Sequence, residues 1–305
     1  MSILRLEQVC KSYNQHHAVD EVSFEIPTGS IFGMLGPNGA GKTSLIRIIT
    51  TIIRADSGTV FFNGEKLSHK HPALIGYMPE ERGLYRKMRV GEHLLYLARL
   101  KGLPKRKARA ALQEWMDHFG ILDWWGKKIE ELSKGMQQKI QFIATVVHRP
   151  PLLILDEPFS GLDPINTNLI KDEIDKMARE GTSIIFSTHR MEQVEEVCQH
   201  IVLINQGRNV LEGPVDEVKH RFKENRFRIQ FLGILPSDLE ERISIIERGA
   251  QSITVQLDGT QDSNSLLRYL LDHQIQVLAF HEILPSLNEI FIKQIGAFDA
   301  ASQNS

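Results

Sequence analysis

Residues 36–43, GPNGAGKT, form a glycine-rich run that ends in a lysine and a threonine. Glycines let the backbone curl so that several N–H groups point at one anion, and a helix that begins after them presents its positive end to the same anion. A lysine and a hydroxyl at the end of such a loop suit a phosphate chain and its Mg²⁺ ion. The spacing G-x-x-x-x-G-K-T therefore predicts a phosphate-binding loop.

The sequence on both sides of this loop supports the prediction. The apolar run 31–35 before it is typical of a buried strand, and residues 44–49 after it follow a helical pattern. We expect Lys42 to reach the β- and γ-phosphates and the Thr43 hydroxyl to ligate Mg²⁺. The nucleotide-binding residues predicted here are Gly36, Pro37, Asn38, Gly39, Ala40, Gly41, Lys42, Thr43 and Ser44.

Asp156 and Glu157 are a second candidate pair, because they follow the continuous apolar run 152–155. Parallel sheets bind their ligands at the carboxyl ends of the strands. We expect Asp156 to hold the metal or its water, and Glu157 to orient an attacking water or accept its proton. An apolar strand that ends in acids is also a common structural arrangement, but a preceding phosphate loop favours the catalytic interpretation.

Residues 132–138, LSKGMQQ, closely resemble the signature sequence of ABC ATPases, and they lie shortly before the Asp156 strand as in that family. Lys134 and Met136 depart from the glycine and glutamine that are usual there. Ser133 is a suitable N-cap for the helix that follows, and a helix N-terminus favours a γ-phosphate. The resemblance implies that Ser133 and Gly135 bind ATP held by another cassette, so that two cassettes enclose two ATP molecules head to tail.

Other family motifs align in order across most of residues 1–220. By resemblance, Tyr13 matches the aromatic residue that stacks on adenine. His189 matches the switch histidine that contacts the γ-phosphate and positions the water. Residues 160–163, SGLD, match the loop that links the two sites of a dimer.

Glu80 stands where the family usually has glutamine. A carboxylate can ligate Mg²⁺ as an amide oxygen does, with added charge, so Glu80 joins Thr43 and Asp156 as a predicted metal ligand. The sequence of residues 80–85 resembles the matching stretch in a branch of exporter ATPases. This branch includes sodium-efflux-type members with C-terminal extensions. The resemblance therefore implies an ATP-binding, ATP-hydrolysing subunit of an ABC transporter.

The elements that must position these residues predict an α/β fold. Apolar strands at 152–155 and 183–186 flank a polar-faced helix at 165–179, which is a βαβ unit and requires a parallel sheet. Residues 90 to 150 are mostly helical in pattern. We therefore expect a P-loop ABC cassette over residues 1–220, with a helical insertion at about 88–150.

The charge-rich run 219–226 indicates a domain boundary. Beyond it, two alternating strands, an amphipathic helix, a further strand and a final helix predict a small C-terminal α/β accessory domain at residues 225–300. We expect this domain to contribute no catalytic group and to act in dimer contacts or regulation. A pendant domain that merely packs on the cassette is the alternative.

Composition limits the choice of partners. The formal charge of −2 gives no basic field for nucleic acid, and two cysteines in 305 residues indicate a reducing compartment. The basic residues Lys101, Lys105, Arg106, Lys107 and Arg109 are typical of a solvated helix face, with an acidic partner or lipid headgroups as the alternative.

We expect a homodimer or heterodimer of cassettes in the cytoplasm. No apolar run approaches the roughly 20 residues needed to span a bilayer, so a separate transmembrane permease would hold the dimer at the cytoplasmic face of the membrane.

Three other functions fit parts of the sequence. A soluble ABC protein of translation or DNA repair usually carries two cassettes or a long coiled-coil insertion, and neither pattern is present. A P-loop kinase or GTPase gives no reason for the signature helix. A regulatory nucleotide-binding module without turnover would need neither Glu157 nor His189.

Overall fold

The computed structural model describes residues 1–81, 83–258 and 262–303. Arg82, within the stretch that resembles exporter ATPases, lies outside the described residues. The chain divides into one unit of residues 1–215 together with 298–305, and a second unit of residues 216–297. The two units meet between Val215 and Asp216, at the start of helix α7 (Val215–Arg221). The predicted boundary, between residues 220 and 225, lies at the other end of this helix.

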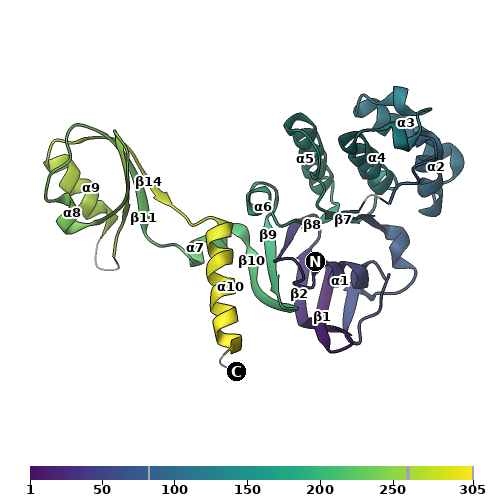
Figure 1. Cartoon of the computed structure of the whole chain (residues 1–305), viewed down its shortest axis with the longest axis horizontal. Coiled ribbons are helices and arrows are strands. Elements are labelled where there is room, and N and C mark those ends of the chain that lie inside the picture. The colour runs from purple at the N-terminus through teal and green to yellow at the C-terminus, as the bar shows by residue number, and fades with distance from the viewer. Residues whose placement is uncertain (82, 259–261, 304–305) are drawn as a thin grey trace. The chain divides into compact units, whose positions relative to one another are not determined.

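Two sheets form the first unit (Figure 1). The smaller sheet is antiparallel, with strand order β2 (His16–Pro27), β1 (Ser2–Tyr13), β4 (Ser57–Phe62) and β5 (Glu65–Lys66). The larger sheet has the order β10 (Arg208–Pro214), β9 (His200–Asn205), β3 (Ile31–Leu35), β8 (Ser183–Ser187), β7 (Leu152–Asp156) and β6 (Ile75–Met78). All its pairings are parallel except that of β9 with β10, which confirms the predicted α/β class.

Helix α1 (Lys42–Ile49) shares one hydrophobic core with both sheets. Its buried face carries Leu45, Ile46 and Ile49, which belong to the same cluster as Phe24 of β2 and Ile154 of β7. Burying each such side chain contributes about 1.5–3 kcal/mol relative to exposure. The loop that precedes α1 is therefore fixed between well-packed elements.

The predicted helical insertion contains α2 (Val90–Leu100), α3 (Lys105–His118) and α4 (Lys134–Val146). Short 3₁₀ turns at Leu122–Trp124 and Ile129–Glu131 connect α3 to α4, and a third at His71–Leu74 precedes β6. Trp115 of α3 and Phe119, which follows the last residue of α3, pack against Phe142 of α4. Helices α5 (Pro164–Arg179) and α6 (Met191–Val197) also belong to the first unit.

The basic residues of this region do not form one solvated face. Lys105 and Lys107 are exposed as expected, but Lys101 is half-buried, and its ammonium group donates hydrogen bonds of 2.7 Å to the carbonyls of Pro72 and Ile75. Burial lowers the pKa of Lys101 from its ordinary value. The expectation was wrong for Lys101 because the end of α2 packs beside β6, which the local pattern does not reveal.

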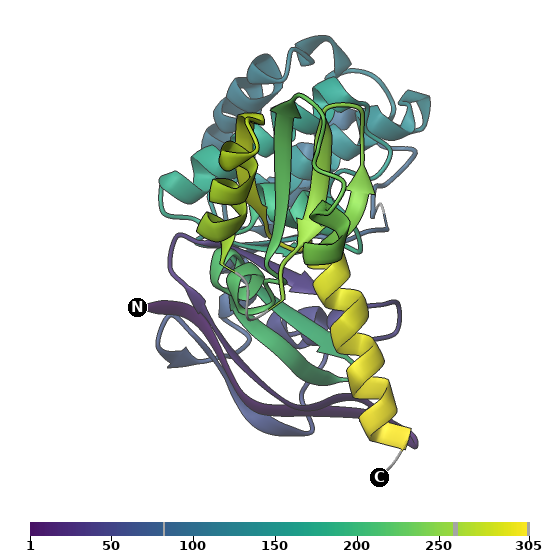
Figure 2. The same cartoon turned by 90° about the vertical axis from the view of Figure 1, so that its left-hand side faces the viewer.

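The second unit holds an antiparallel sheet of order β12 (Ser244–Arg248), β13 (Ser252–Gln256), β11 (Arg226–Leu232) and β14 (Gln276–Ile283). Helices α8 (Leu239–Arg242) and α9 (Ser263–Asp272) cover one face of this sheet, and Figure 2 views the unit from that side. Leu266 and Leu270 of α9 meet Ile229 and Ile253 in its core. Helix α10 (Leu287–Gln303) follows.

No helix among the described residues is both long enough and apolar enough to cross a membrane.

Candidate functional site

The register of the larger sheet brings the predicted motifs to one edge. Ser187 at the end of β8 lies beside Met34 of β3 on one side and beside Asp156 of β7 on the other. Because these strands are parallel, their carboxyl ends meet. The phosphate loop, the acidic pair and the residues after β8 therefore converge from three separate parts of the chain.

The conformation of the loop requires glycine at two positions. Gly36 has φ 151° and Gly41 has φ 108°, a region that side chains disfavour. A Cβ atom would lie 2.2 Å from the carbonyl oxygen of Ile204 at Gly36, and 2.2 Å from that of Ala18 at Gly41. Neither position leaves room for a side chain, so the loop passes close to the neighbouring backbone at both glycines.

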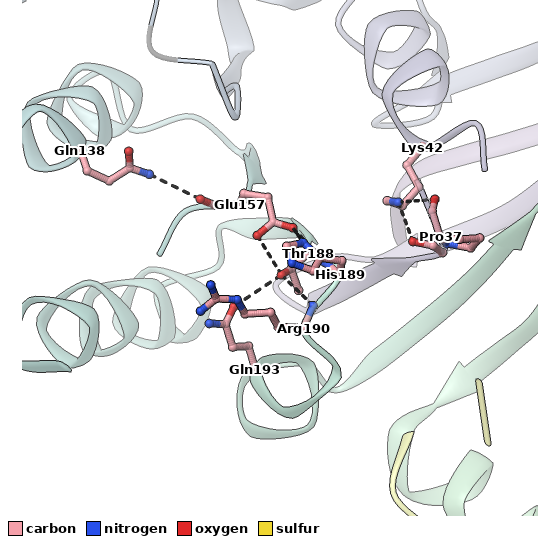
Figure 3. Close-up of polar contacts among 9 residues, drawn as sticks. Pro37, Lys42, Gln138, Glu157, Thr188, His189, Arg190 and Gln193 are labelled. Carbon is pink, nitrogen blue, oxygen red and sulfur yellow. Dashed lines mark hydrogen bonds and ion pairs between the residues drawn. The ribbon is translucent and has the colours of Figure 1, made fainter. Parts of the chain in front are cut away.

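Lys42, the first residue of α1, folds back over the loop (Figure 3). Its ammonium group donates hydrogen bonds to the carbonyls of Gly36 at 2.7 Å and Pro37 at 3.0 Å. Burial lowers the pKa of Lys42, while the carboxylates of Asp156 and Glu157 act in the opposite direction. A cation is thus held at the mouth of the loop, facing the acidic pair.

A cavity of about 360 Å³ joins these groups. Its volume falls within the range typical of small-molecule sites, about 300–1,000 Å³. The lining includes the predicted residues Tyr13, Asn38, Gly39, Ala40, Gly41, Lys42, Thr43, Ser44, Glu80, Asp156, Glu157 and His189, together with His16, Ala18 and Ser187, which the sequence did not single out. Gly36 and Pro37 contribute to the site through the carbonyls that hold Lys42.

The Glu157 carboxylate is held by the residues after β8. One oxygen accepts the backbone N–H of His189 at 2.9 Å and lies 2.7 Å from Nδ1 of its ring, and the other accepts the Thr188 hydroxyl at 3.1 Å (Figure 3). Glu157 has φ 51°, a left-handed conformation that costs a non-glycine residue about 1–3 kcal/mol. The neighbouring contacts outweigh this strain and aim the carboxylate at the cavity.

Asp156, Glu80 and Thr43 supply the oxygen donors that Mg²⁺ prefers, and all three line the cavity. Burial raises the pKa of Asp156, while a hydrogen bond from Ser187 acts to lower it. Among the described residues, no three histidine, cysteine or acidic side chains gather into a metal-binding cluster. The donor set fits an ion held by one or two carboxylates and by the phosphates of a nucleotide, as is usual for Mg²⁺.

Ser133 caps α4, since its hydroxyl accepts the backbone N–H of Met136 at 3.3 Å. Neither Ser133 nor Gly135 is part of the lining of the cavity. Gly135 instead lies against the turn that precedes α5, where an added Cβ would be 3.2 Å from the carbonyl oxygen of Gly161. The N-terminus of the signature helix therefore does not contribute to the phosphate site of its own chain.

Four polar residues of the site were not predicted, namely His16, Ser187, Thr188 and Gln138. Ser187 and Thr188 directly follow the apolar part of β8. They could have been found, like His189, from the tendency of parallel sheets to bind ligands at the carboxyl ends of their strands. Gln138 lies in the signature helix, but its contact with residues 157 and 158 joins segments that no local pattern connects.

Two family descriptions match separate parts of the chain. Residues 19–160 match the ABC transporter family. Residues 213–295 match the C-terminal domain of ATP-binding proteins similar to DrrA1-3. The first match contains the phosphate loop and the acidic pair, and the second covers the strands and helices of the second unit.

Relatives extend this similarity over nearly the whole chain. It is 41% identical to the ABC transporter ATP-binding protein YhaQ of Bacillus subtilis, over 97% of this chain and 99% of that protein. It is 29% identical to the daunorubicin/doxorubicin resistance ATP-binding protein DrrA of Streptomyces peucetius, over 94% and 90% of the two chains. Among solved structures, an ATP-binding subunit of an ABC transporter is similar with a TM-score of 0.68 and 27% identity, over 72% of this chain and 93% of that one.

Proposed function

This chain belongs to the ABC transporter family as an ATP-binding subunit with ATPase activity, and we propose that its cassette pairs with a second one to hydrolyse Mg-ATP on behalf of a separate membrane permease. The observation that supports this most directly is the single cavity that unites the phosphate loop with Asp156, Glu157 and His189.

The proposed reaction is in-line attack of water on the γ-phosphate. The amides of the phosphate loop and Lys42 bind and neutralise the phosphates, and Tyr13, which also lines the cavity, stacks on the base. Glu157 orients the water and accepts its proton, while the neighbouring His189 holds the γ-phosphate. Positioning and charge neutralisation do most of the work, as is usual in phosphoryl transfer.

Thr43, Glu80 and Asp156 would hold Mg²⁺ in this site. When bound, the ion would neutralise part of the negative charge on the phosphates. Two other carboxylates, those of Glu80 and Glu157, lie near Asp156. Their negative charges raise the pKa of Asp156 in addition to the effect of burial. A cation in the site would relieve this repulsion, which favours binding of the metal together with the nucleotide.

Pairing of cassettes is proposed because the chain has one phosphate loop and one signature helix, and they do not share a cavity. Ser133 and Gly135 would bind the ATP of the second cassette, where the positive end of α4 meets the γ-phosphate. Whether the second cassette is an identical chain or a related one depends on the transporter that it serves.

The permease would contact a groove of about 310 Å³ in the first unit. It lies beside the stretch that begins at Glu80, and its wall is mainly apolar. Such a surface suits an apolar segment of a partner. The lining residues are Tyr77, Pro79, Gly83, Leu84, Leu97, Leu100, Lys101, Gln141, Ala144 and Thr145.

Docking of the permease in this groove would place the subunit at the cytoplasmic face of the membrane. The direction of transport is proposed to be export, because the name of the relative DrrA describes a role in drug resistance.

The proposed metal site predicts a specific change in Mg²⁺ dependence. Glu80→Ala should raise the Mg²⁺ concentration for half-maximal ATP hydrolysis by about 10-fold or more, because it removes a ligand charge. The measurement is ATPase rate against free Mg²⁺ at fixed ATP. Glu81→Ala is the matched control, since Glu81 is an exposed neighbouring carboxylate that does not line the cavity. Equal Mg²⁺ dependence in both variants would contradict the proposed role of Glu80 as a metal ligand.

The C-terminal domain is proposed to regulate the dimer and to supply no catalytic group, since the residues that line the cavity all precede residue 190. A fragment of residues 1–221, which keeps α7 whole, should bind ATP with the affinity of the full chain and retain turnover. Its ATP-dependent dimerisation, followed by light scattering, should change. A folded fragment that fails to bind ATP would show that the nucleotide site needs the second unit.

A further inference from the structure

Gln138 connects the signature helix to the backbone of the catalytic segment. It lies on α4, five residues after the cap Ser133, and only 2% of its surface is exposed. Its side-chain amide donates a hydrogen bond of 2.9 Å to the carbonyl of Pro158. It also makes a longer contact of 3.5 Å with the carbonyl of Glu157, which Figure 3 shows. The helix that faces a partner's ATP in the proposed dimer is thereby joined to the segment that carries the proton acceptor.

The conformation of Glu157 gives this contact its importance. Glu157 has φ 51°, which is a strained conformation for a partly buried non-glycine residue, so contacts on its two sides must hold it there. On one side, its N–H bonds the Ser187 carbonyl at 2.8 Å, and Thr188 and His189 hold its carboxylate. On the other side, Gln138 holds the carbonyl of Pro158 at 2.9 Å. The Glu157 carbonyl accepts the N–H of Ser160 at 3.1 Å and the longer contact from Gln138 at 3.5 Å.

We propose that Gln138 is a positioning residue for ATP hydrolysis, which keeps the Glu157 carboxylate aimed at the attacking water. This rests on the proposed catalytic role of Glu157. Because Ser133 lies on the same helix, displacement of α4 by the partner's ATP is transmitted through Gln138 to Glu157 of the same chain. The contact couples engagement of the second cassette to readiness for hydrolysis in the first.

A purely structural role would make a different prediction. A buried amide that satisfies two carbonyls stabilises the fold, and its loss would lower stability without a selective effect on the chemical step. A positioning role instead predicts a lower kcat with an unchanged affinity for ATP, because Gln138 does not line the nucleotide cavity. The separation of kcat from binding therefore distinguishes the two.

The test is Gln138→Met in the full-length chain, which keeps the shape of the side chain and removes the donor. We expect kcat to fall about 10- to 100-fold, as misplacement of a catalytic group does, while KM and the Kd for a non-hydrolysable ATP analogue stay within about twofold. The matched control is Thr50→Val, which removes the buried hydrogen bond of 2.8 Å from its hydroxyl to the Ile46 carbonyl, away from the cavity. It should keep full kcat.

The outcomes are distinct. Full kcat in Gln138→Met, or equal losses of kcat in Gln138→Met and Thr50→Val, would overturn the proposal. If Gln138→Met does not fold, Gln138→Asn withdraws the donor by one methylene and is judged by the same criteria. Glu157→Gln is measured alongside: full turnover in that variant would refute the proposed function itself, whereas an inactive Glu157→Gln beside a fully active Gln138→Met would refute only the role of Gln138.

Discussion

We expect Lys42→Ala to abolish ATP binding at ordinary nucleotide concentrations. The lysine ammonium lies at the mouth of the phosphate loop, where it already bonds two loop carbonyls and faces Asp156 and Glu157. Losing a charge-assisted hydrogen bond costs about 1.5–3 kcal/mol, and leaving the acidic pair without its neighbouring cation adds repulsion against the phosphates. Titration calorimetry with ATP and Mg²⁺ should give an affinity at least 10-fold weaker.

A control separates this site effect from the loss of one positive charge. Lys107 is exposed on α3 and does not line the cavity, so Lys107→Ala should bind ATP as the unchanged protein does. A near-normal affinity of Lys42→Ala for ATP would contradict the interpretation of the loop as the phosphate site.

Glu157→Gln should bind ATP with normal affinity and hydrolyse it about 10²- to 10⁴-fold more slowly, because the proton acceptor is lost while the shape is kept. The amide oxygen can still accept the backbone N–H of His189, which bonds the carboxylate at 2.9 Å, so the left-handed turn at residue 157 should persist. With hydrolysis blocked, ATP remains between the cassettes. Steady-state turnover and light scattering with Mg-ATP should show slow hydrolysis and an accumulated dimer.

Glu180→Gln provides the comparison, because Glu180 is an exposed carboxylate outside the nucleotide cavity. It should change neither turnover nor the monomer-dimer equilibrium. A Glu157→Gln protein that turns over at the full rate would contradict the catalytic role of Glu157. One that binds Mg-ATP and stays monomeric would contradict the proposed pairing of cassettes.

Much of the fold follows from local pattern. The apolar runs 31–35 and 152–155 predicted buried strands, and both are central strands of the parallel sheet. By contrast, β12 and α8 of the second unit were not predicted. Strand β12 is mostly exposed and α8 has four residues, so neither has the periodic apolar face on which such predictions depend.

The candidate site divides in the same way. The phosphate loop and the pair 156–157 could be found in the sequence, because the chemistry of each motif is carried by contiguous residues. Ser187 takes its place between β3 and β7 only through the order of strands in the sheet. His16 reaches the cavity because β1 and β2 pair as a hairpin that carries it alongside Tyr13.

The sequence by itself determined that this chain binds ATP and belongs with ABC cassettes. Each of the motifs that indicate this, residues 36–43 and 132–138, consists of contiguous residues and can be recognised without the fold. Only the tertiary structure decided how Glu157, the proposed catalytic glutamate, is held. The left-handed φ of Glu157 and its contacts with Thr188, His189 and Gln138 join segments 19 to 32 residues apart. Such contacts depend on the register of β7 with β8 and on the packing of α4 against the turn after β7, which are set by the whole core and by no local pattern.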